Sequence, residues 1–497
     1  MSLPASLGCA LVLLFAAASF ADHEPVIVDS PGNPLVSFRF VFHTGSANDP
    51  VGKEGLNALT AAMISEGGTR ELSLVQVIEK LYPLAAGVGA QTEKEITTIV
   101  GAVHRDFLED FYAIFQDLLL HPRFDPEDFE RNRNQLLNYL SKSLRGSDDE
   151  ELGKALLEAM LYREHPFRHT PQGTVAGLQS ITLDDVKAFY RDHYTFASLR
   201  IGLAGDLPPG FAERVQKDLR QDLPEGQETP PELPRPSPAG GMEVWIAEKA
   251  ADSTAISLGF PYQVTRSDPD FYPLLVANTY LGDHRSFHGV LMNNLRGKRG
   301  LNYGDYSYIE KFVQDGGSTF PLPNTTRHQQ FFSLWLRPVV PANAHFALRA
   351  ALWELRKLVE QGISEEDFQA TRNYLLHYSK LWVQNLDRRL GYHMDSRFYG
   401  TDDYYIDEIE RRLRSLTAEE VNRAVKKHLD RWDFRVAMVA SSAGDLAAAL
   451  RENWVSPVTY QTPGTPPEVL EEDKKIERFE LPVREVRVIP VEELFEK

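Results

Sequence analysis

Cysteine is almost absent from this chain of 497 residues, whose single thiol is Cys9. Residues 1–21 contain no charged side chain and carry an apolar run at 11–18, followed by the tripeptide Ser-Phe-Ala. Small residues after such a run are typical of a secretory signal, so we expect residues 1–21 to be a signal peptide that is cut near Asp22. The remaining chain then has no thiol, which excludes disulfides, cysteine nucleophiles and cysteine-bound metals.

Long apolar runs and basic runs are also missing. No other stretch approaches the roughly 18 uninterrupted apolar residues that indicate a membrane helix, so we expect no membrane span. The chain has 53 Lys and Arg against 71 Asp and Glu, a net charge of −18. Because no run of Lys or Arg could follow a phosphate backbone, we do not expect a nucleic-acid partner. The apolar content of 42% and the length instead predict two or more packed domains.

A proline-rich segment near the middle divides the chain. Residues 224–238 contain six prolines together with Glu, Thr and Ser. This composition cannot form a helix or a central strand and indicates a semi-rigid linker. We therefore expect an N-terminal half at 22–223, a linker at 224–241, a C-terminal half at 242–456 and an extended tail at 457–497.

The two halves carry an internal repeat. Aligning residues 127–139 with 366–378 gives eight identical positions, beginning with Glu-Asp-Phe in both copies. Further on, Ser180, Thr182, Val186 and His193 match Ser415, Thr417, Val421 and His428 in order. Repetition at this scale indicates duplication of one ancestral unit.

Each copy alternates strand-like and helix-like patterns. Because long helices and strands interleave, we expect sheets that helices cover on one face. The expected strands lie at 36–43, 96–103, 199–203, 255–260, 331–336 and 434–440. The expected long helices include 56–66, 106–119 and 344–360.

Three blocks together resemble one known family. An apolar helix at 56–66 follows a Thr-Gly-Ser loop and is ended by two glycines, and a second helix begins at Asp125-Pro126-Glu127. The third block is Leu-Arg-Gly-Lys-Arg-Gly-Leu-Asn-Tyr at 295–303. These features resemble the insulinase/pitrilysin family of zinc metallopeptidases, and the duplication is itself a feature of that family. The resemblance implies an α+β fold of mitochondrial-processing-peptidase type, with two homologous, antiparallel-rich halves joined by the linker into a clamshell.

Active members of this family bind zinc through H-x-x-E-H. Two His one helical turn apart present two metal ligands on one face, and the Glu takes a proton from the metal-bound water. Aligned on the Gly-Leu that opens the helix, these positions are Asn57, Thr60 and Ala61. The third ligand, a Glu in the family, falls at Asn138 or Tyr139. The resemblance therefore implies a degenerate site with no metal and no catalytic residue in this chain.

Other patterns that could suggest a ligand site have simpler interpretations. His284 and His288, like His165 and His169, are four residues apart, a spacing that on a helix would place each pair on one face. Neither pair has a carboxylate at the required offset, and a proline interrupts the second pair. The glycosylation-like Asn324-Thr325-Thr326 is interpreted as a polar loop.

Arg296 and Tyr303 are the remaining candidate site residues. For an isolated Arg and Tyr the ordinary interpretation is a surface ion pair and a packed ring. In active relatives, however, the matching pair donates hydrogen bonds to the substrate backbone and the developing oxyanion. The resemblance therefore implies a substrate-binding role for both residues, preserved although the metal positions are lost.

Three functions follow from this pattern of loss. The first is a non-catalytic subunit of a heterodimeric periplasmic peptidase that acts on peptides, in which zinc lies in a partner carrying H-x-x-E-H. The second is a structural or assembly protein of the same fold with no role in proteolysis. The third, a self-sufficient hydrolase with an unusual site, would require bound metal in this chain.

Overall fold

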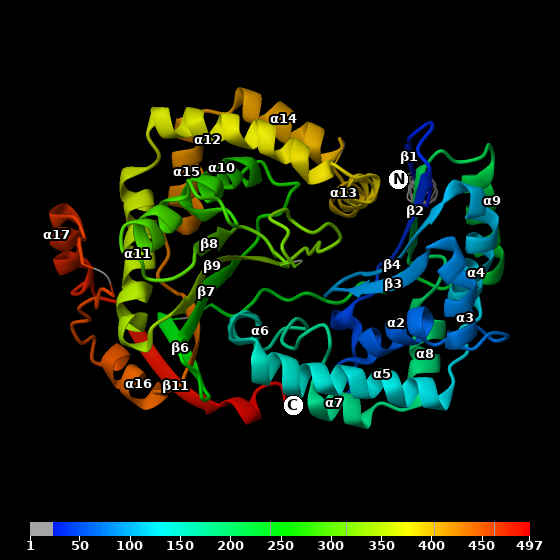
Figure 1. Cartoon of the computed structure of the whole chain (residues 1–497), viewed down its shortest axis with the longest axis horizontal. Coiled ribbons are helices and arrows are strands. Elements are labelled where there is room, and N and C mark those ends of the chain that lie inside the picture. The colour runs from blue at the N-terminus through cyan, green and yellow to red at the C-terminus, as the bar shows by residue number, and fades with distance from the viewer. Residues whose placement is uncertain (1–22, 239, 315, 402, 462) are drawn as a thin grey trace, which may run out of the picture.

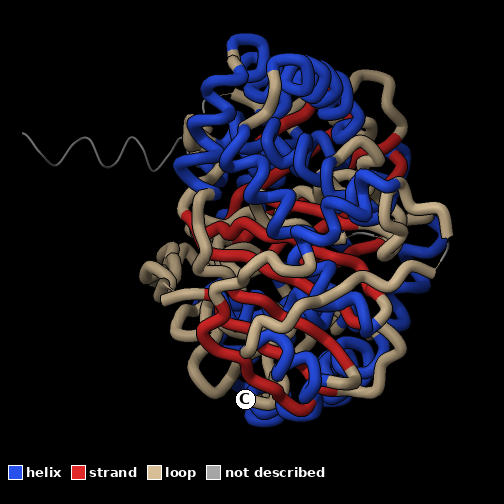
Figure 2. Tube along the Cα trace, turned by 90° about the vertical axis from the view of Figure 1, so that its left-hand side faces the viewer, coloured by secondary structure: helices blue, strands red, loops and turns tan. Residues whose placement is uncertain are grey.

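The fold contains two mixed sheets, one in each half of the chain (Figure 1). The computed structural model describes residues 23–238, 240–314, 316–401, 403–461 and 463–497. The expected signal peptide therefore lies outside the described residues. Within them, no helix is long and apolar enough to cross a membrane. Strands cross the interior and most helices lie outside them (Figure 2).

The sheet of the N-terminal half has the strand order β1-β5-β2-β4-β3. The outer pair β1 and β5 is parallel, and every other pair is antiparallel. The strands are β1 Val26–Asp29, β2 Leu35–Phe42, β3 Gly87–Thr92, β4 Thr97–His104 and β5 Leu199–Gly205.

The sheet of the C-terminal half repeats this order and adds one strand. Its order is β11-β6-β10-β7-β9-β8, so β6, β10, β7, β9 and β8 take the places of β1, β5, β2, β4 and β3. The parallel pair β6 and β10 also corresponds to the pair β1 and β5. The duplication is therefore confirmed by topology. The strands are β6 Met242–Glu248, β7 Thr254–Tyr262, β8 Asp305–Tyr308, β9 Gln330–Val339, β10 Arg435–Ala440 and β11 Val483–Pro490.

The helices follow the same duplication. Those of the N-terminal half are α2 Leu56–Glu66, α3 Leu74–Leu81, α4 Leu108–Leu120, α5 Pro126–Asn138, α6 Asp149–Leu161, α7 Val175–Ser180, α8 Leu183–His193 and α9 Phe211–Asp222. Those of the C-terminal half are α10 Phe271–Gly282, α11 Ala344–Gln361, α12 Glu365–Tyr378, α13 Leu386–Tyr399, α14 Tyr405–Ser415, α15 Ala418–Leu429, α16 Ala443–Arg451 and α17 Pro467–Ile476. The repeated block at 127–139 and 366–378 thus forms α5 and α12 together with the residue that follows α5.

Alternating side chains on β2 build the core of the first half. Phe38 and Phe40 point to the same face because strand side chains alternate. Their rings lie 5.3 Å from Phe111 and 5.0 Å from Phe115, respectively, and all four side chains are fully buried. Both partners stand on α4, so α4 covers this face of the sheet.

Helices also cross from one half to the other. Helix α6 packs on β7 and β10 of the second sheet, and side chains of α6 share one apolar cluster with Ala437 and Val439. In return, α13 packs on β1, β2 and β5, where Arg39 contacts Asp387 at 2.6 Å. The two halves therefore share one apolar cluster and pack directly against each other.

The linker is bonded to the N-terminal half along much of its length. None of its described residues belongs to a helix or strand. Phe196 donates a backbone hydrogen bond to the carbonyl of Pro224, and Asn48 donates to the carbonyl of Thr229. Glu228 accepts from both His43 and Arg200. The linker therefore follows the edge of the first half.

The C-terminal segment corrects our expectation of an extended tail. It contains α17, and β11 pairs in parallel with β6 as the sixth strand of the second sheet. Its last residues reach the first half, where Val175 donates to the carbonyl of Phe495 and Arg145 contacts Glu496. The apolar alternation at 486–491 is real, but it belongs to a strand that closes a sheet edge.

Candidate functional site

Helix α2 is the helix that the sequence aligns with the zinc-binding helix of active relatives. It starts after Gly55, whose φ of 108° is accessible mainly to glycine. The carboxylate of Asp49 accepts from the backbone N–H groups of Gly55 and Asn57, both at 2.7 Å. These contacts satisfy donors that have no partner within the first turn. The helix is therefore well anchored although its ligands are gone.

The three aligned positions on α2 are buried and serve packing. Asn57 donates to the hydroxyl of Thr97 at 3.0 Å, and the hydroxyl of Thr60 donates to the Leu56 carbonyl. Ala61 is fully buried. Reading the motif one residue later gives Ala58, Ala61 and Ala62, which also lack ligand atoms. Neither frame can therefore hold zinc.

The position of the third ligand still lies close to this helix. Asn132 on α5 contacts the sulfur of Met63, and Arg131 donates to the carbonyl of Glu66, so α5 runs antiparallel to α2. Tyr139 comes seven residues after Asn132, roughly 10 Å further along the helix, which brings it level with the start of α2. Burial raises the pKa of Tyr139 to about 12. Helix α5 thus packs on α2, and neither Asn138 nor Tyr139 offers the carboxylate of a third ligand.

The histidine pairs do not form a substitute metal site. Both pairs lie in turns, so their spacing of four does not place them on one helix face. His284 contacts the Tyr308 hydroxyl at 2.7 Å, while His169 contacts the Thr170 carbonyl. Across the described residues, no group of three or more His, Cys, Asp or Glu side chains could hold a metal ion.

The sequon at Asn324 is buried between the halves. Asn324 is 1% exposed, accepts from Arg39 at 2.6 Å and donates to Asp395 at 2.8 Å. The polar loop interpretation is therefore incomplete, because this asparagine joins the first sheet to α13. A glycan has no access to it in the folded chain.

Within the block 295–303, Arg299 has a structural role. Its guanidinium is completely buried and donates to Asp473 at 2.7 Å and to Glu472 at 2.8 Å. Both carboxylates belong to α17. The block is thus fixed to the C-terminal segment, a contact that sequence reasoning missed because 174 residues separate the partners.

Arg296 and Tyr303 behave differently from Arg299. Arg296 is the second-last residue of the π-helical turn Met292–Gly297, and its guanidinium lies 5.3 Å from the ring of Phe287. Tyr303 is 80% exposed and Phe287 is 64% exposed. Among the described residues, neither the guanidinium of Arg296 nor the phenol of Tyr303 has a hydrogen bond or an ion pair. The fold therefore does not use either polar group.

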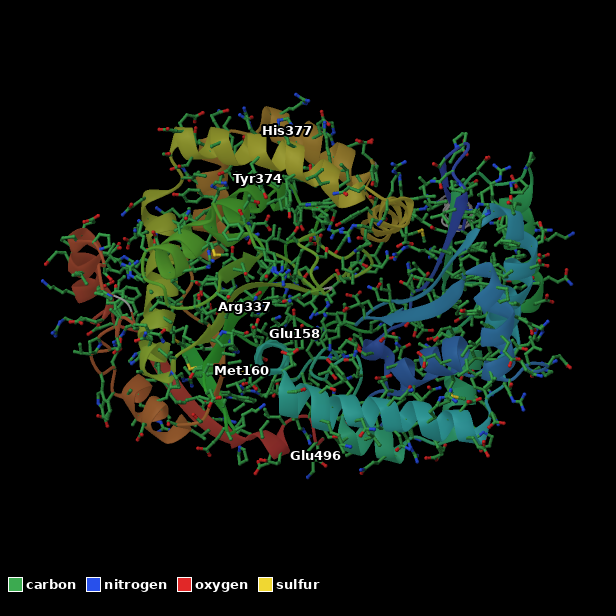
Figure 3. All side chains as sticks on the ribbon, in the orientation of Figure 1. Glu158, Met160, Arg337, Tyr374, His377 and Glu496 are labelled. Atoms are coloured by element: carbon green, nitrogen blue, oxygen red, sulfur yellow. The ribbon has the colours of Figure 1, made fainter. Side chains whose placement is uncertain are left out.

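A buried charge centre between the halves was also absent from our expectations. Arg327 is completely buried and contacts Glu158 at 2.8 Å and Glu93 at 3.0 Å (Figure 3 labels Glu158 in the middle of the molecule). Lys311 pairs with Glu158, and Lys94 donates to the His169 carbonyl. Burial lowers the pKa of Lys94 to about 7. Burial alone would raise the pKa of Glu158, but the surrounding cations hold it well below its usual range. Only the fold brings these residues together.

Two family models match the chain in succession. The model described as Insulinase (Peptidase family M16) matches residues 26–172, and Peptidase M16 inactive domain matches residues 180–375. The chain belongs to peptidase family M16. The boundary between the two models lies before the linker, within the first half.

Two relatives match along most of their length, and a third matches over less than half of its length. The chain is 22% identical over 424 residues to the "Non-peptidase homolog YmxG" of Helicobacter pylori, covering 85% of this chain and 93% of that protein. It is 21% identical over 417 residues to the "Uncharacterized zinc protease YmxG" of Bacillus subtilis. This match covers 84% of this chain and 96% of that protein. It is 24% identical over 217 residues to the probable mitochondrial-processing peptidase subunit beta of Arabidopsis thaliana. This match covers 43% of this chain and 40% of that protein.

Solved M16 structures share the fold. A peptidase M16 inactive domain from Pseudomonas fluorescens has a TM-score of 0.73 at 22% identity. The match covers 84% of the present chain and 95% of the Pseudomonas chain. A chain of complex III2 from Candida albicans has a TM-score of 0.68 at 12% identity. The match covers 91% of the present chain and 96% of the complex III2 chain. With no ligand side chain in either frame of the motif, this chain is an inactive homologue of the M16 zinc peptidases.

Proposed function

We propose that this M16 chain is the non-catalytic, substrate-contacting subunit of a two-chain zinc peptidase. Its partner is an M16 subunit that carries H-x-x-E-H, and zinc is bound there. This chain supplies Arg296 and Tyr303 to peptides or unfolded polypeptides held near that zinc. The signal-like residues 1–21 support export across the inner membrane, with the complex in the periplasm.

The lack of side-chain polar partners at Arg296 and Tyr303, within the described residues, carries this proposal. In one nine-residue block, Arg299 is buried and paired, whereas the partly buried Arg296 and the exposed Tyr303 have side chains without polar partners among the described residues. A phenol and a guanidinium without partners in the chain can each donate a hydrogen bond to a bound substrate. Such bonds offset the cost of removing these groups from water when the substrate binds. A purely structural block would not require this division between paired and unpaired polar groups.

A three-arm hydrolysis experiment tests the proposal. A quenched fluorescent peptide library is exposed to this chain, to an H-x-x-E-H partner from the same organism, and to both together. We expect hydrolysis only in the mixture. An equal rate with the partner alone would remove this chain from catalysis.

Substitutions in the same block test the roles of the two residues. Arg296→Ala and Tyr303→Phe should each lower kcat/KM of the mixture by about 10²-fold, the scale for loss of one oxyanion donor. Lys298→Ala is the matched control, because Lys298 is an exposed cation in the same block. Thermal unfolding of the chain alone should not change in any of the three variants.

A structural or assembly role is the second candidate, favoured by the similarity in fold to the complex III2 chain. It predicts that the two chains form a stable complex, measured by light scattering. It also predicts that Arg296→Ala and Tyr303→Phe leave both the complex and its rate of hydrolysis unchanged. The same variants therefore separate the two functions.

A further inference from the structure

A groove of about 670 Å³ lies between α3 and α4, on the face of α4 that turns away from the first sheet. It follows about three turns of α4, from Asp110 to His121. Its apolar wall consists of side chains that are not buried, namely Leu72, Leu84, Ala113, Ile114 and Leu120. A groove of this shape suits an amphipathic helix that lies along it.

Helix α11 is the counterpart of α4 in the second half. The offset that aligns 127–139 with 366–378 also places 108–120, which is all of α4, on 347–359 within α11. The two helices follow β4 and β9, which take the same place in their sheets. The groove residues Asp110, Ile114 and Asp117 correspond in order to Arg349, Trp353 and Arg356. The two helix faces can therefore be compared residue by residue.

In the second half, the C-terminal segment covers this face. Helix α17 lies on the outer side of α11 (Figure 1). The indole N–H of Trp353 donates to Glu472 on α17 at 3.2 Å. Arg349 donates to the carbonyls of Glu477 and Phe479, which follow α17, at 2.6 and 2.8 Å. The face that binds a helix on α11 is thus left as an open groove on α4 by the described residues.

The chain beside each helix also takes part. Arg299, six residues before β8, donates to Glu472 and Asp473 and so holds α17. Lys80 lies seven residues before β3, the counterpart of β8, and lines the groove. Its ammonium is exposed and has no hydrogen bond or ion pair among the described residues. A cation thus lies beside the groove in nearly the place from which Arg299 binds α17.

The charges on α4 are opposite to those on α11. Where α11 carries Arg349 and Arg356, α4 carries Asp110 and Asp117. Asp110 is exposed without a hydrogen bond or ion pair among the described residues, and Asp117 contacts only His121, at 2.9 Å. Helix α17, which α11 binds through donors, has four acidic residues and two lysines. Because α4 offers acceptors instead, complementarity requires Lys or Arg on its occupant.

We propose that the groove between α3 and α4 binds a basic amphipathic helix of a partner polypeptide. Its apolar side packs on Ile114 and Leu120, its Lys or Arg side chains donate to Asp110 and Asp117, and one carboxylate pairs with Lys80. A second copy of this chain does not supply this helix through α17, which is acidic and held on its own α11. The inference does not depend on the function proposed above.

Two labelled peptides test binding to the chain without residues 1–21, measured by fluorescence anisotropy. The acidic peptide has the sequence of residues 466–479. The basic peptide is the same except for Glu471→Lys, Glu472→Lys and Glu477→Lys. We expect saturable binding of the basic peptide and at least about tenfold weaker binding of the acidic one. No binding of the basic peptide, or equal binding of both, would overturn the proposal.

A charge-reversed variant assigns the binding to the groove. Asp110→Arg combined with Asp117→Arg gives α4 the charges of α11, so the basic peptide should lose at least about tenfold in affinity and the acidic peptide should gain. Glu213→Arg combined with Asp222→Arg is the control, because it changes the net charge equally at exposed positions of α9, outside the groove. An equal loss in the control would show attraction to the acidic chain as a whole and contradict the proposal.

A steric variant gives a second readout that does not depend on charge. Ala113 is exposed and lines the groove, so Ala113→Trp fills the space without disturbing the core. The basic peptide should then lose at least about tenfold in affinity, while the midpoint of thermal unfolding of the chain alone stays the same. Unchanged affinity would place the peptide elsewhere on the surface.

Discussion

Arg299 donates its Nε–H to Oδ1 of Asp473 across 2.7 Å, and this contact fixes the block 295–303 to α17. A second nitrogen of the same guanidinium donates to Glu472 at 2.8 Å. The side chain of Arg299 is fully buried and that of Asp473 is 7% exposed. The C-terminal segment therefore supports the turn from which Arg296 and Tyr303 extend.

Replacing Arg299 should unfold the chain more easily. Arg299→Met leaves the buried carboxylate of Asp473 without its counter-charge, which costs about 3–5 kcal/mol for a buried pair. The free energy of unfolding, measured by urea denaturation, reports this loss. Lys474→Gln on the same helix is the control, because Lys474 and Glu471 form an exposed pair whose loss changes stability by about 0.5 kcal/mol or less. Equal stability of both variants would contradict this role of Arg299.

Arg327 should hold the two halves in one cooperative unit. Arg327→Met leaves Glu93 and Glu158 buried without their common partner, with an expected cost of about 3–5 kcal/mol. Arg337→Met breaks another contact between the halves, with Glu150 at 2.9 Å, but both side chains are partly exposed, so about 1 kcal/mol is expected. Circular dichroism and tryptophan fluorescence should give coincident transitions in the unmodified chain. Separate transitions would show that the halves unfold independently.

Glu228 should make the linker sensitive to acid. Burial raises its pKa, but hydrogen bonds and charge from His43 and Arg200 outweigh burial and hold the pKa at about 2, below the ordinary 4.5. Because the folded pKa is depressed, the contribution is complete above about pH 5 and is lost as pH falls toward 2. Glu228→Gln should therefore lower stability near pH 7, and the difference from the unmodified chain should disappear near pH 2.

The measurement for Glu228 is the urea midpoint at a series of pH values. Glu232→Gln, an exposed position of the same linker, serves as the control and should follow the unmodified chain throughout. A constant difference between Glu228→Gln and the unmodified chain from neutral to acid pH would show that charge at this position does not matter.

Chelation should leave this chain unchanged. The positions matching the zinc ligands carry amide, hydroxyl and methyl groups, so we expect no stoichiometric zinc by mass spectrometry of the purified protein. Incubation with EDTA should not shift its thermal unfolding. The H-x-x-E-H partner is the positive control and should lose both metal and activity. One equivalent of zinc in this chain, with stability lost on its removal, would contradict the degenerate site.

Much of the fold could be predicted from the sequence because its signals are local. The helix expected at 56–66 has those bounds, and the strands expected at 36–43 and 434–440 correspond to β2 and β10. The match between 127–139 and 366–378 predicted the duplication that both sheets show. In contrast, the strand at 483–490 was missed as part of a sheet, because its partner β6 lies some 240 residues earlier in the chain.

The sequence by itself determined the loss of the metal ligands and the presence of Arg296 and Tyr303, because the identity of a side chain sets which atoms it can offer. Only the tertiary structure decided that Arg299 is buried while Lys298 and Tyr303 of the same block are exposed, and that Arg327 lies at the junction of the halves. Burial and pairing depend on residues that are distant in the chain, and local patterns carry no information about them.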